Sequence, residues 1–216
     1  MEIVRNSAIR RLPTYYRHIV KMDKQGIEFT SARILSELTG VHKTQIRKDI
    51  ALTGLVGVPR RGHNVKALIK AISEYLNWND ISSAFVVGAG NLGKALLNYD
   101  NFEASGMRIV AAFDTSVNEI GKEINGKEIL PMDKFTDLTE RMHINIGIIT
   151  TPADIAQPIA DLMVEAGIKG IWNFTYTQLK VPDDIVVETV DLYRGLGVLS
   201  KRLAEQEAAE SQPTTI

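Results

Sequence analysis

A glycine pattern near the middle of the chain has the spacing of a nucleotide-binding turn. The pattern is GxGxxG and comprises Gly88, Ala89, Gly90, Asn91, Leu92 and Gly93. An apolar run (84–87) precedes it, and a segment typical of a helix (94–99) follows. In that context the first glycine permits a tight turn, the second lets backbone N–H groups approach a pyrophosphate, and the third lets helix and sheet pack closely. The residues therefore predict a phosphate-binding turn at a helix N-terminus.

A carboxylate lies where such a turn needs one. Asp114 ends a second apolar run (108–113) and follows Gly93 by 21 residues. At that place a carboxylate accepts hydrogen bonds from both ribose hydroxyls of NAD and repels the 2′-phosphate of NADP. The sequence therefore predicts NADH or NAD⁺ as the ligand. Another nucleotide-bearing compound, such as coenzyme A, is the alternative.

The elements that must position these residues alternate between strands and helices. Apolar, β-branched runs and helical patterns follow one another at 131–142, 144–149, 153–167, 170–174 and 185–190. This alternation is typical of a parallel sheet that is covered on both faces. Because ligands bind at the carboxyl ends of such strands, residues near Thr150 and Asn173 are expected at the same crevice.

Residues for acid–base catalysis beside a nicotinamide are not in place. Tyr176 and Lys180 match the Tyr-xxx-Lys pattern of short-chain dehydrogenases, but they lie between two expected strands with Pro182 directly behind them. The chain has no cysteine, and no pair of its histidines has the spacing of metal ligands. We therefore expect no catalytic residue, no metal and no enzyme activity, with the dinucleotide acting as a signal. An NAD-dependent oxidoreductase with a basic N-terminal extension is the first alternative.

The charge of the chain is divided unevenly between its halves. Residues 1–75 carry 14 Lys and Arg against 6 Asp and Glu, whereas residues 76–216 carry 11 against 20. A basic half suits nucleic-acid binding, so two domains with different partners are expected. No apolar run approaches the ~20 residues that span a bilayer, and no signal peptide is recognisable. This favours a cytoplasmic protein without a membrane partner.

Short helical patterns in the basic half predict a helix-turn-helix from about Tyr16 to Gly54. Ser7 is a cap for a first helix, and a second segment is expected to begin at Pro13. The last helix of the motif, 42–53, is basic. Its outward side chains suit phosphates and base edges in a major groove, and they are Lys43, Gln45, Arg47 and Lys48.

A hairpin wing is expected directly after this helix. Residues 55–63 place Arg60 and Arg61 at the hairpin tip, where they could contact phosphates or a minor groove of double-stranded DNA. A further helix follows and ends near Trp78. The basic half is therefore expected to be a winged helix-turn-helix domain over residues 1–78.

The remaining residues predict a Rossmann domain and a C-terminal helix. The Rossmann domain is expected over 79–190 and the helix over 191–206, followed by a disordered polar tail over 207–216. The helix carries an apolar stripe of Leu192, Leu196, Leu199 and Leu203. Such a stripe suits packing against a partner helix or against the chain's own sheet.

Several motifs, in this order along the chain, resemble the bacterial Rex redox-sensing transcriptional repressors. The segments that carry the resemblance are 11–17 (RLPTYYR), 46–49 (IRKD), 88–93 (GAGNLG), 95–99 (ALLNY), 166–171 (AGIKGI) and 173–174 (NF). The likeness extends from about residue 7 to about residue 203. It implies a homodimer of winged-helix and Rossmann subunits with the C-terminal helix swapped into the partner. It also implies binding to a palindromic operator when NADH is scarce and release when NADH binds.

The resemblance also implies roles for individual residues. By position, the glycine turn and Asp114 would hold the cofactor, with Thr150, Thr151 and Pro152 near its nicotinamide end. Tyr99 is placed both at the cofactor and, with Arg17 and Asp191, among residues that exchange partners as the dimer closes.

The departures from the family pattern lie mostly on the DNA side. Leu52 and Thr53 stand where the family usually has an aromatic pair, and the segment Val58–His63 stands where its wing usually reads Lys-Arg-Gly-x-Gly-Tyr. In the cofactor half, Thr151 replaces a usual valine. A nucleotide-sensing module without DNA binding is therefore the second alternative.

Overall fold

The structure is a computed structural model that describes the backbone of residues 2–210 and the side chains of 7–191 and 193–208. Its contacts divide the chain into two compact units. The first comprises the residues up to Ile81 together with 104–106, and the second comprises 82–103 and the residues from 107 onward. Each unit is described separately.

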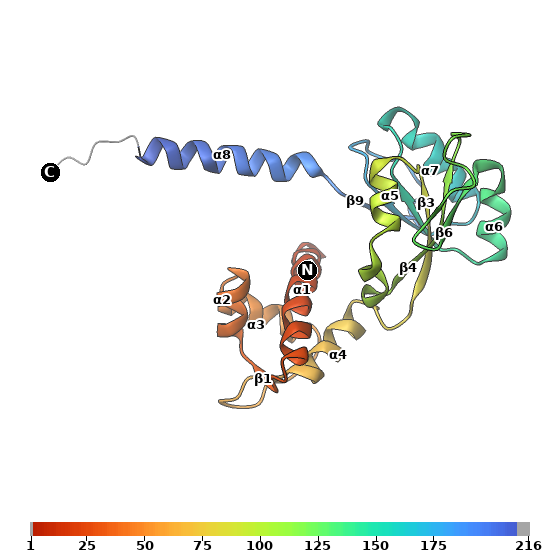
Figure 1. Cartoon of the computed structure of the whole chain (residues 1–216). Helices are drawn as coiled ribbons and strands as arrows, with labels where there is room; N and C mark the ends of the chain where they lie inside the picture. Colours follow the sequence, from red (N-terminus) through yellow and green to blue (C-terminus); the bar gives the residue numbers. More distant parts are fainter. Residues whose placement is uncertain (1, 211–216) are drawn as a thin grey trace. The chain divides into compact units, whose positions relative to one another are not determined.

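The first unit is a small helical bundle with a two-stranded sheet (Figure 1). Its elements are α1 (Glu2–Lys24), β1 (Phe29–Thr30), α2 (Ala32–Thr39), α3 (Lys43–Ala51), β2 (His63–Asn64) and α4 (Val65–Tyr75). One apolar core joins the helices and includes Leu12, Tyr15, Leu35, Ile46, Ile50, Leu68 and Ile72. The basic half of the sequence therefore builds a core of its own.

Helix α1 is continuous, although a new segment was expected at Pro13. Pro13 lies inside the helix, where a proline removes one backbone hydrogen bond. The buried side chains Ala8, Leu12, Tyr15, Ile19 and Met22 recur at helical spacing and place one face of α1 in the core. Packing of that face over many turns outweighs the local cost of the proline.

Local signals define the helix-turn-helix. The hydroxyl of Ser31 accepts from Ile34 N and caps α2, and Gly40 ends α2 in the left-handed region at φ 70°. His42 caps α3 because its Nδ1 accepts from Thr44 N at 3.3 Å. The turn between α2 and α3 is therefore short and fixed at both ends.

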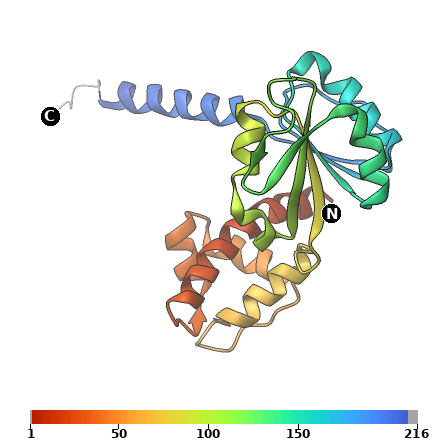
Figure 2. The same ribbon diagram turned by 45° about the vertical axis from the view of Figure 1, so that its right-hand side comes forward.

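The second unit is a doubly wound sheet with helices on both faces (Figure 2). Its strands are β3 (Ser82–Val87), β4 (Met107–Asp114), β5 (Glu123–Ile124), β6 (Lys127–Pro131), β7 (Ile146–Ile149), β8 (Gly170–Asn173) and β9 (Val186–Thr189). The spatial order is β5-β6-β4-β3-β7-β8-β9, and only the β5–β6 pair is antiparallel. The chain passes from β3 to β4 on one side and returns to β7 on the other. The strand order thus reverses at β3, where α/β sheets bind ligands.

Helices and short 3₁₀ segments connect these strands. They are α5 (Asn91–Leu97), η1 (Asp100–Ser105), η2 (Met132–Lys134), α6 (Phe135–Arg141), η3 (Ala153–Ile155) and α7 (Ala156–Glu165). Helices α6 and α7 cover a face whose core includes Phe85, Phe113 and Phe135. Helix α5 packs on the opposite face, where Leu97 joins Val86 and Ile148.

The last helix, α8 (Leu192–Glu210), extends four residues past the expected end at residue 206. Residues 205–210 are Glu, Gln and Ala, all strong helix formers, so the polar composition continues the helix instead of ending it. The rest of the expected disordered tail, 211–216, lies outside the described residues. Among the helices in the described residues, none combines the length and hydropathy needed to cross a membrane.

Candidate nucleotide site and nucleic-acid interface

The glycine turn connects β3 to α5 and closely approaches its neighbours. Gly88 has φ 102°, a conformation that side-chain-bearing residues rarely adopt. A Cβ on Gly93 would overlap the carbonyl oxygen of Gly88, so only glycine lets α5 begin against the turn. A Cβ on Gly90, by contrast, would meet no atom within 4 Å. The turn therefore leaves open space beside Gly90, where a phosphate group fits.

The carboxylate of Asp114 is tied to this turn. Its Oδ2 accepts from the backbone N–H of Ala89 at 2.6 Å, and its Oδ1 accepts from Ser116 N at 2.8 Å. Each carboxylate oxygen has a further lone-pair direction for a ligand hydroxyl. Asp114 can therefore hold the turn and bind a ribose together.

Thr150 stabilises the turn from the other side. It follows β7, and its hydroxyl oxygen lies 2.6 Å from the carbonyl oxygen of Gly88 and 3.1 Å from that of Val87. Both carbonyl oxygens can accept its proton. The hydroxyl proton is therefore directed at the protein backbone. Thr150 therefore shapes the turn through its contacts with Val87 and Gly88.

A cavity of about 320 Å³ opens where β3, β4 and β7 end. The predicted site residues that line it are Gly88, Gly90, Asp114, Thr150, Thr151 and Pro152. Its apolar wall contains Phe113, Met132, Ile155 and Ile159. Such a wall suits a flat base, while the polar residues suit a ribose and phosphates, so the site fits a nucleotide.

This apolar wall was not expected from the sequence. Met132 follows β6, and the short strands β5 and β6 were not expected. Ile155 and Ile159 are one helical turn apart on the η3–α7 segment, and this i, i+4 spacing is the signal that could have identified them. Thr151 has a buried hydroxyl for which the described residues provide no hydrogen-bond partner.

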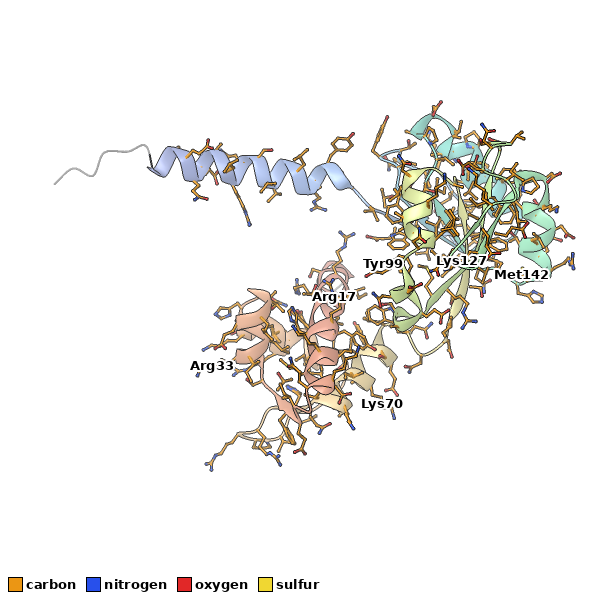
Figure 3. All side chains as sticks on the ribbon, viewed as in Figure 1. Arg17, Arg33, Lys70, Tyr99, Lys127 and Met142 are labelled. Atoms are coloured by element: carbon orange, nitrogen blue, oxygen red, sulfur yellow. The ribbon has the colours of Figure 1, made fainter. Side chains whose placement is uncertain are left out.

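Other predicted cofactor residues do not line the cavity. Ala89 contributes its backbone N–H to Asp114, and Asn91, Leu92 and Gly93 form the first turn of α5. Tyr99 lies past the end of α5 and is 51% exposed (Figure 3). It packs on Phe102 at 4.8 Å between ring centroids and lines a different, smaller cavity with Lys127.

The Tyr-xxx-Lys pair is not arranged for catalysis. Tyr176 and Lys180 lie in the irregular segment between β8 and β9, and Tyr176 is 75% exposed. Asn173 is fully buried, and its amide is engaged by Thr175 and by the carbonyl oxygen of Thr177. In the part of the chain that the structure describes, no group of three acidic, His or Cys side chains could hold a metal.

The cations predicted to contact DNA lie on the surface of the first unit. Lys43, Arg47 and Lys48 are exposed on α3, whereas Gln45 is half-buried. Arg17 on α1 and Arg33 on α2 project outward from the same unit (Figure 3). Helix α3 therefore presents a basic surface.

The wing is built on the β1–β2 pair. Val58 and Gly62 close the hairpin, and Arg60 lies at its tip with φ 62°. The guanidinium of Arg61 lies 3.8 Å from the ring centroid of Phe29 and 3.6 Å from a carboxylate oxygen of Glu28. Arg61 is therefore held against the wing base, whereas Arg60 extends from the tip.

His63 forms the base of the wing and is itself half-buried. Its Nδ1 is buried without a hydrogen-bond partner among the described residues, as is the hydroxyl of its cross-strand neighbour Thr30. Burial lowers the pKa of the His63 imidazole below its usual value.

The remaining predicted switch residues lie on the surfaces of the two units. Arg17 is an exposed residue of the first unit, and Tyr99 and Asp191 are exposed residues of the second. Asp191 precedes α8, and its Oδ1 accepts from Arg194 N at 3.1 Å. It therefore also caps the helix.

Two family models match the chain. Residues 4–51 match the model described as "Putative DNA-binding protein N-terminus", and 79–177 match the model described as "CoA binding domain". A redox-sensing transcriptional repressor Rex from Treponema denticola is 41% identical over 192 residues, which is 89% of this chain and 91% of that protein. A second Rex repressor, from a Thermoanaerobacter species, is 40% identical and covers 95% of this chain and 92% of its own length.

Solved structures of the Rex-family repressor RSP are also similar. RSP in complex with β-NADH has a TM-score of 0.85 and 38% identity, covering 94% of this chain and 96% of that one. RSP in complex with β-NAD⁺ and operator DNA has a TM-score of 0.85 and 39% identity, covering 94% of each chain.

Proposed function

The chain belongs to the Rex family of redox-sensing transcriptional repressors, and on that premise we propose how its two sites work together. It binds operator DNA when the ratio of NADH to NAD⁺ is low and leaves the operator when NADH binds. The observation that carries this proposal is that one chain holds a nucleotide cavity with Asp114 and a basic helix-turn-helix with a wing. As a Rex repressor the chain is a regulator and not an enzyme.

The cofactor site would use the residues that line the cavity. The pyrophosphate would bind beside Gly90 at the N-terminus of α5, and Asp114 would accept the ribose hydroxyls. The carboxylate favours NAD(H) over NADP(H), because a 2′-phosphate would meet a second negative charge. Thr151 and Pro152 would contact the ligand from the end of β7. Ala89, Asn91, Leu92 and Gly93 would form the turn and the first turn of the helix.

The DNA site would combine α3 and the wing. Lys43, Arg47 and Lys48 would contact phosphates and base edges, and Gln45 would contact a base. Arg60 extends from the wing tip and would contact phosphates or a minor groove, with Arg61 supporting it from the wing base.

The active form would be a homodimer on a palindromic operator. Every described side chain of α8 is exposed, and the apolar residues Leu196, Leu199 and Leu203 are 54–64% exposed. The sheet offers an apolar face in return, because Trp172 and Phe174 are only half-buried on the α5 side. Packing of α8 against the sheet of a second copy would cover both surfaces. A two-fold dimer then reads a two-fold site.

NADH can release the operator only if the dimer has two forms and NADH prefers one of them. The form that cannot bind DNA must have a higher affinity for NADH than the form that binds DNA. A 100-fold loss of operator affinity requires about 2.7 kcal/mol of coupling. Arg17, Tyr99 and Asp191 are the residues we assign to the exchange of contacts. We also propose a cytoplasmic location, because the protein would act on DNA in response to a metabolic nucleotide.

The test is binding to a pool of random duplex DNA at physiological salt, with and without NADH, followed by sequencing of the retained fraction. A palindrome enriched only without NADH is the expected result. No enrichment in either condition, from protein that binds NADH, would contradict the proposal. That outcome would favour a nucleotide-sensing module without DNA binding.

A further inference from the structure

A buried carboxylate lies beneath the basic surface of α3. Asp49 is 1% exposed, although its neighbours Arg47 and Lys48 are exposed. Both of its oxygens are used. Arg11 of α1 donates from Nε to Oδ2 and from Nη2 to Oδ1, each at 2.7 Å, and Tyr15 donates its hydroxyl to Oδ2 at 2.8 Å. Asp49 therefore joins α3 to α1.

The fourth partner of this carboxylate is a residue of the DNA-facing helix itself. Gln45 lies one turn before Asp49, and its Nε2 donates to Oδ1 at 2.8 Å. Burial alone would raise the pKa of Asp49, but hydrogen bonds from Arg11, Gln45 and Tyr15 outweigh it and lower the pKa. The group is therefore an ionised carboxylate at neutral pH and only accepts hydrogen bonds.

An acceptor-only neighbour determines which way the Gln45 amide faces. The NH₂ group must face Asp49, and the carbonyl Oε1 must face away from it. One N–H of the amide is used by Asp49, and the described residues provide no partner for the second N–H or for Oε1. A donor and an acceptor side by side match N7 and N6 of adenine in a major groove.

We propose that Asp49 is a positioning residue that holds the Gln45 amide in the orientation that reads one adenine in each half of the operator. Without the carboxylate the amide rotates between two orientations, and one of them presents donor and acceptor in the wrong order. Arg11 fixes the carboxylate in turn by donating to both of its oxygens, so the orientation depends on the packing of α1 against α3. The proposal rests on the assignment of α3 as the DNA-reading helix.

The test uses the full-length protein and a library containing every single base-pair substitution of its selected operator. Gln45→Met removes both polar groups and keeps the shape of the side chain. It is expected to lower discrimination at one base pair per half-site by about tenfold or more, the range of a bidentate contact. Asp49→Asn is expected to lower discrimination at the same base pair, because an asparagine can donate as well as accept.

Tyr15→Phe is the matched control. It removes a hydrogen bond from Oδ2 and leaves the Gln45 contact on Oδ1. We expect a lower melting temperature and an unchanged preference at every base pair. A relaxed preference in Tyr15→Phe would reduce the role of Asp49 to general stability and overturn the proposal.

Asp49→Glu tests the same point if Asp49→Asn does not fold. It keeps the negative charge for Arg11 but moves the oxygens by one methylene, which displaces the partner of Gln45. Full discrimination in this variant, in Asp49→Asn or in Gln45→Met would overturn the proposal.

A separate variant distinguishes failure of the DNA-reading assignment. If Arg47→Ala binds the operator as the wild type does, α3 is not the DNA-reading helix, and the role of Asp49 fails together with that assignment. If Arg47→Ala weakens binding while Gln45→Met keeps the base preference, only the role of Asp49 fails.

Discussion

The hydroxyl of Thr150 lies 2.6 Å from the carbonyl oxygen of Gly88 and ties the end of β7 to the turn after β3. These two residues are far apart in the sequence but adjacent at the point where the strand order reverses. A Cβ on Gly88 would lie 2.9 Å from the carbonyl carbon of Thr150, so the contact leaves no space for a side chain. The shape of the nucleotide turn therefore depends on two strands.

Removing the hydroxyl of Thr150 should weaken the turn without creating a cavity in the core. Thr150→Val keeps the shape and leaves two carbonyl groups with fewer partners, so we expect a loss of about 1 kcal/mol of stability. We also expect weaker binding of NADH in a calorimetric titration. Thr150→Ser keeps the hydroxyl and serves as the control. A loss in Thr150→Ser and none in Thr150→Val would show that the methyl group, and not the hydroxyl, matters.

Gly90 and Gly93 should respond differently to the same substitution. Gly93→Ala places a methyl group on the carbonyl oxygen of Gly88 and should cost about 1–3 kcal/mol of stability. Gly90 has φ −70° and open space around it, so Gly90→Ala should keep the melting temperature of the wild type. Its methyl group occupies the space assigned to the pyrophosphate, and NADH affinity should fall by about tenfold or more. Unchanged NADH affinity in Gly90→Ala would move the phosphate site elsewhere.

Asp114→Ala should weaken NADH and NAD⁺ alike, because both share the ribose that we assign to this carboxylate. Hydrogen bonds to a charged group contribute about 1.5–3 kcal/mol, which corresponds to a loss of about ten- to 150-fold. Titration of both nucleotides, with coenzyme A as a third, measures this directly. A loss confined to NADH, or tighter binding of coenzyme A than of NADH in the wild type, would contradict the assignment.

His63 should make the first unit less stable in mild acid. Its pKa in the folded protein is below the usual value of 6.5, so the unfolded chain takes up a proton first as the pH falls. The stability from a neutral His63 is present above about pH 6.5 and is lost as the pH falls toward the folded pKa. Melting temperatures of the wild type and His63→Phe between pH 8 and pH 5 measure the difference. Parallel curves for the two proteins would rule out this role.

The apolar stripe of α8 should control the oligomeric state. Leu196→Asp with Leu199→Asp should raise the dissociation constant of the dimer by about 100-fold or more, since burial of each leucine contributes about 1.5–3 kcal/mol. Lys201→Ala changes the opposite side of the helix and is the control. Sedimentation of the two variants at several concentrations compares them. A dimer that survives the double substitution would place the interface elsewhere.

The glycine turn and the helix-turn-helix were predictable because their signals are local. The spacing of Gly88, Gly90 and Gly93 and the caps at Ser31 and Gly40 require no distant partner. Strands β5 and β6 were missed because they are only two and five residues long, too short to give a clear periodic pattern. Continuity through Pro13 was missed because packing along the whole of α1 decides it.

The burial of Asp49 was not predictable from its neighbours in the sequence. In the run Arg47-Lys48-Asp49 it resembles one more surface charge on a basic helix. Its burial depends on Arg11, which is 38 positions earlier and on another helix. Local pattern therefore identified the exposed cations of α3 but not the anion beneath them.

The exposure of α8 makes the state of this helix depend on the concentration of the protein in the cell. A helix of 19 residues without packing partners is only marginally stable in water. If a second chain supplies those partners, folding of this helix becomes a step of association and obeys mass action. Below a threshold number of copies the helix would melt and the operator would be vacated at any nucleotide ratio. Cell volume and expression level would then set repression together with the redox state.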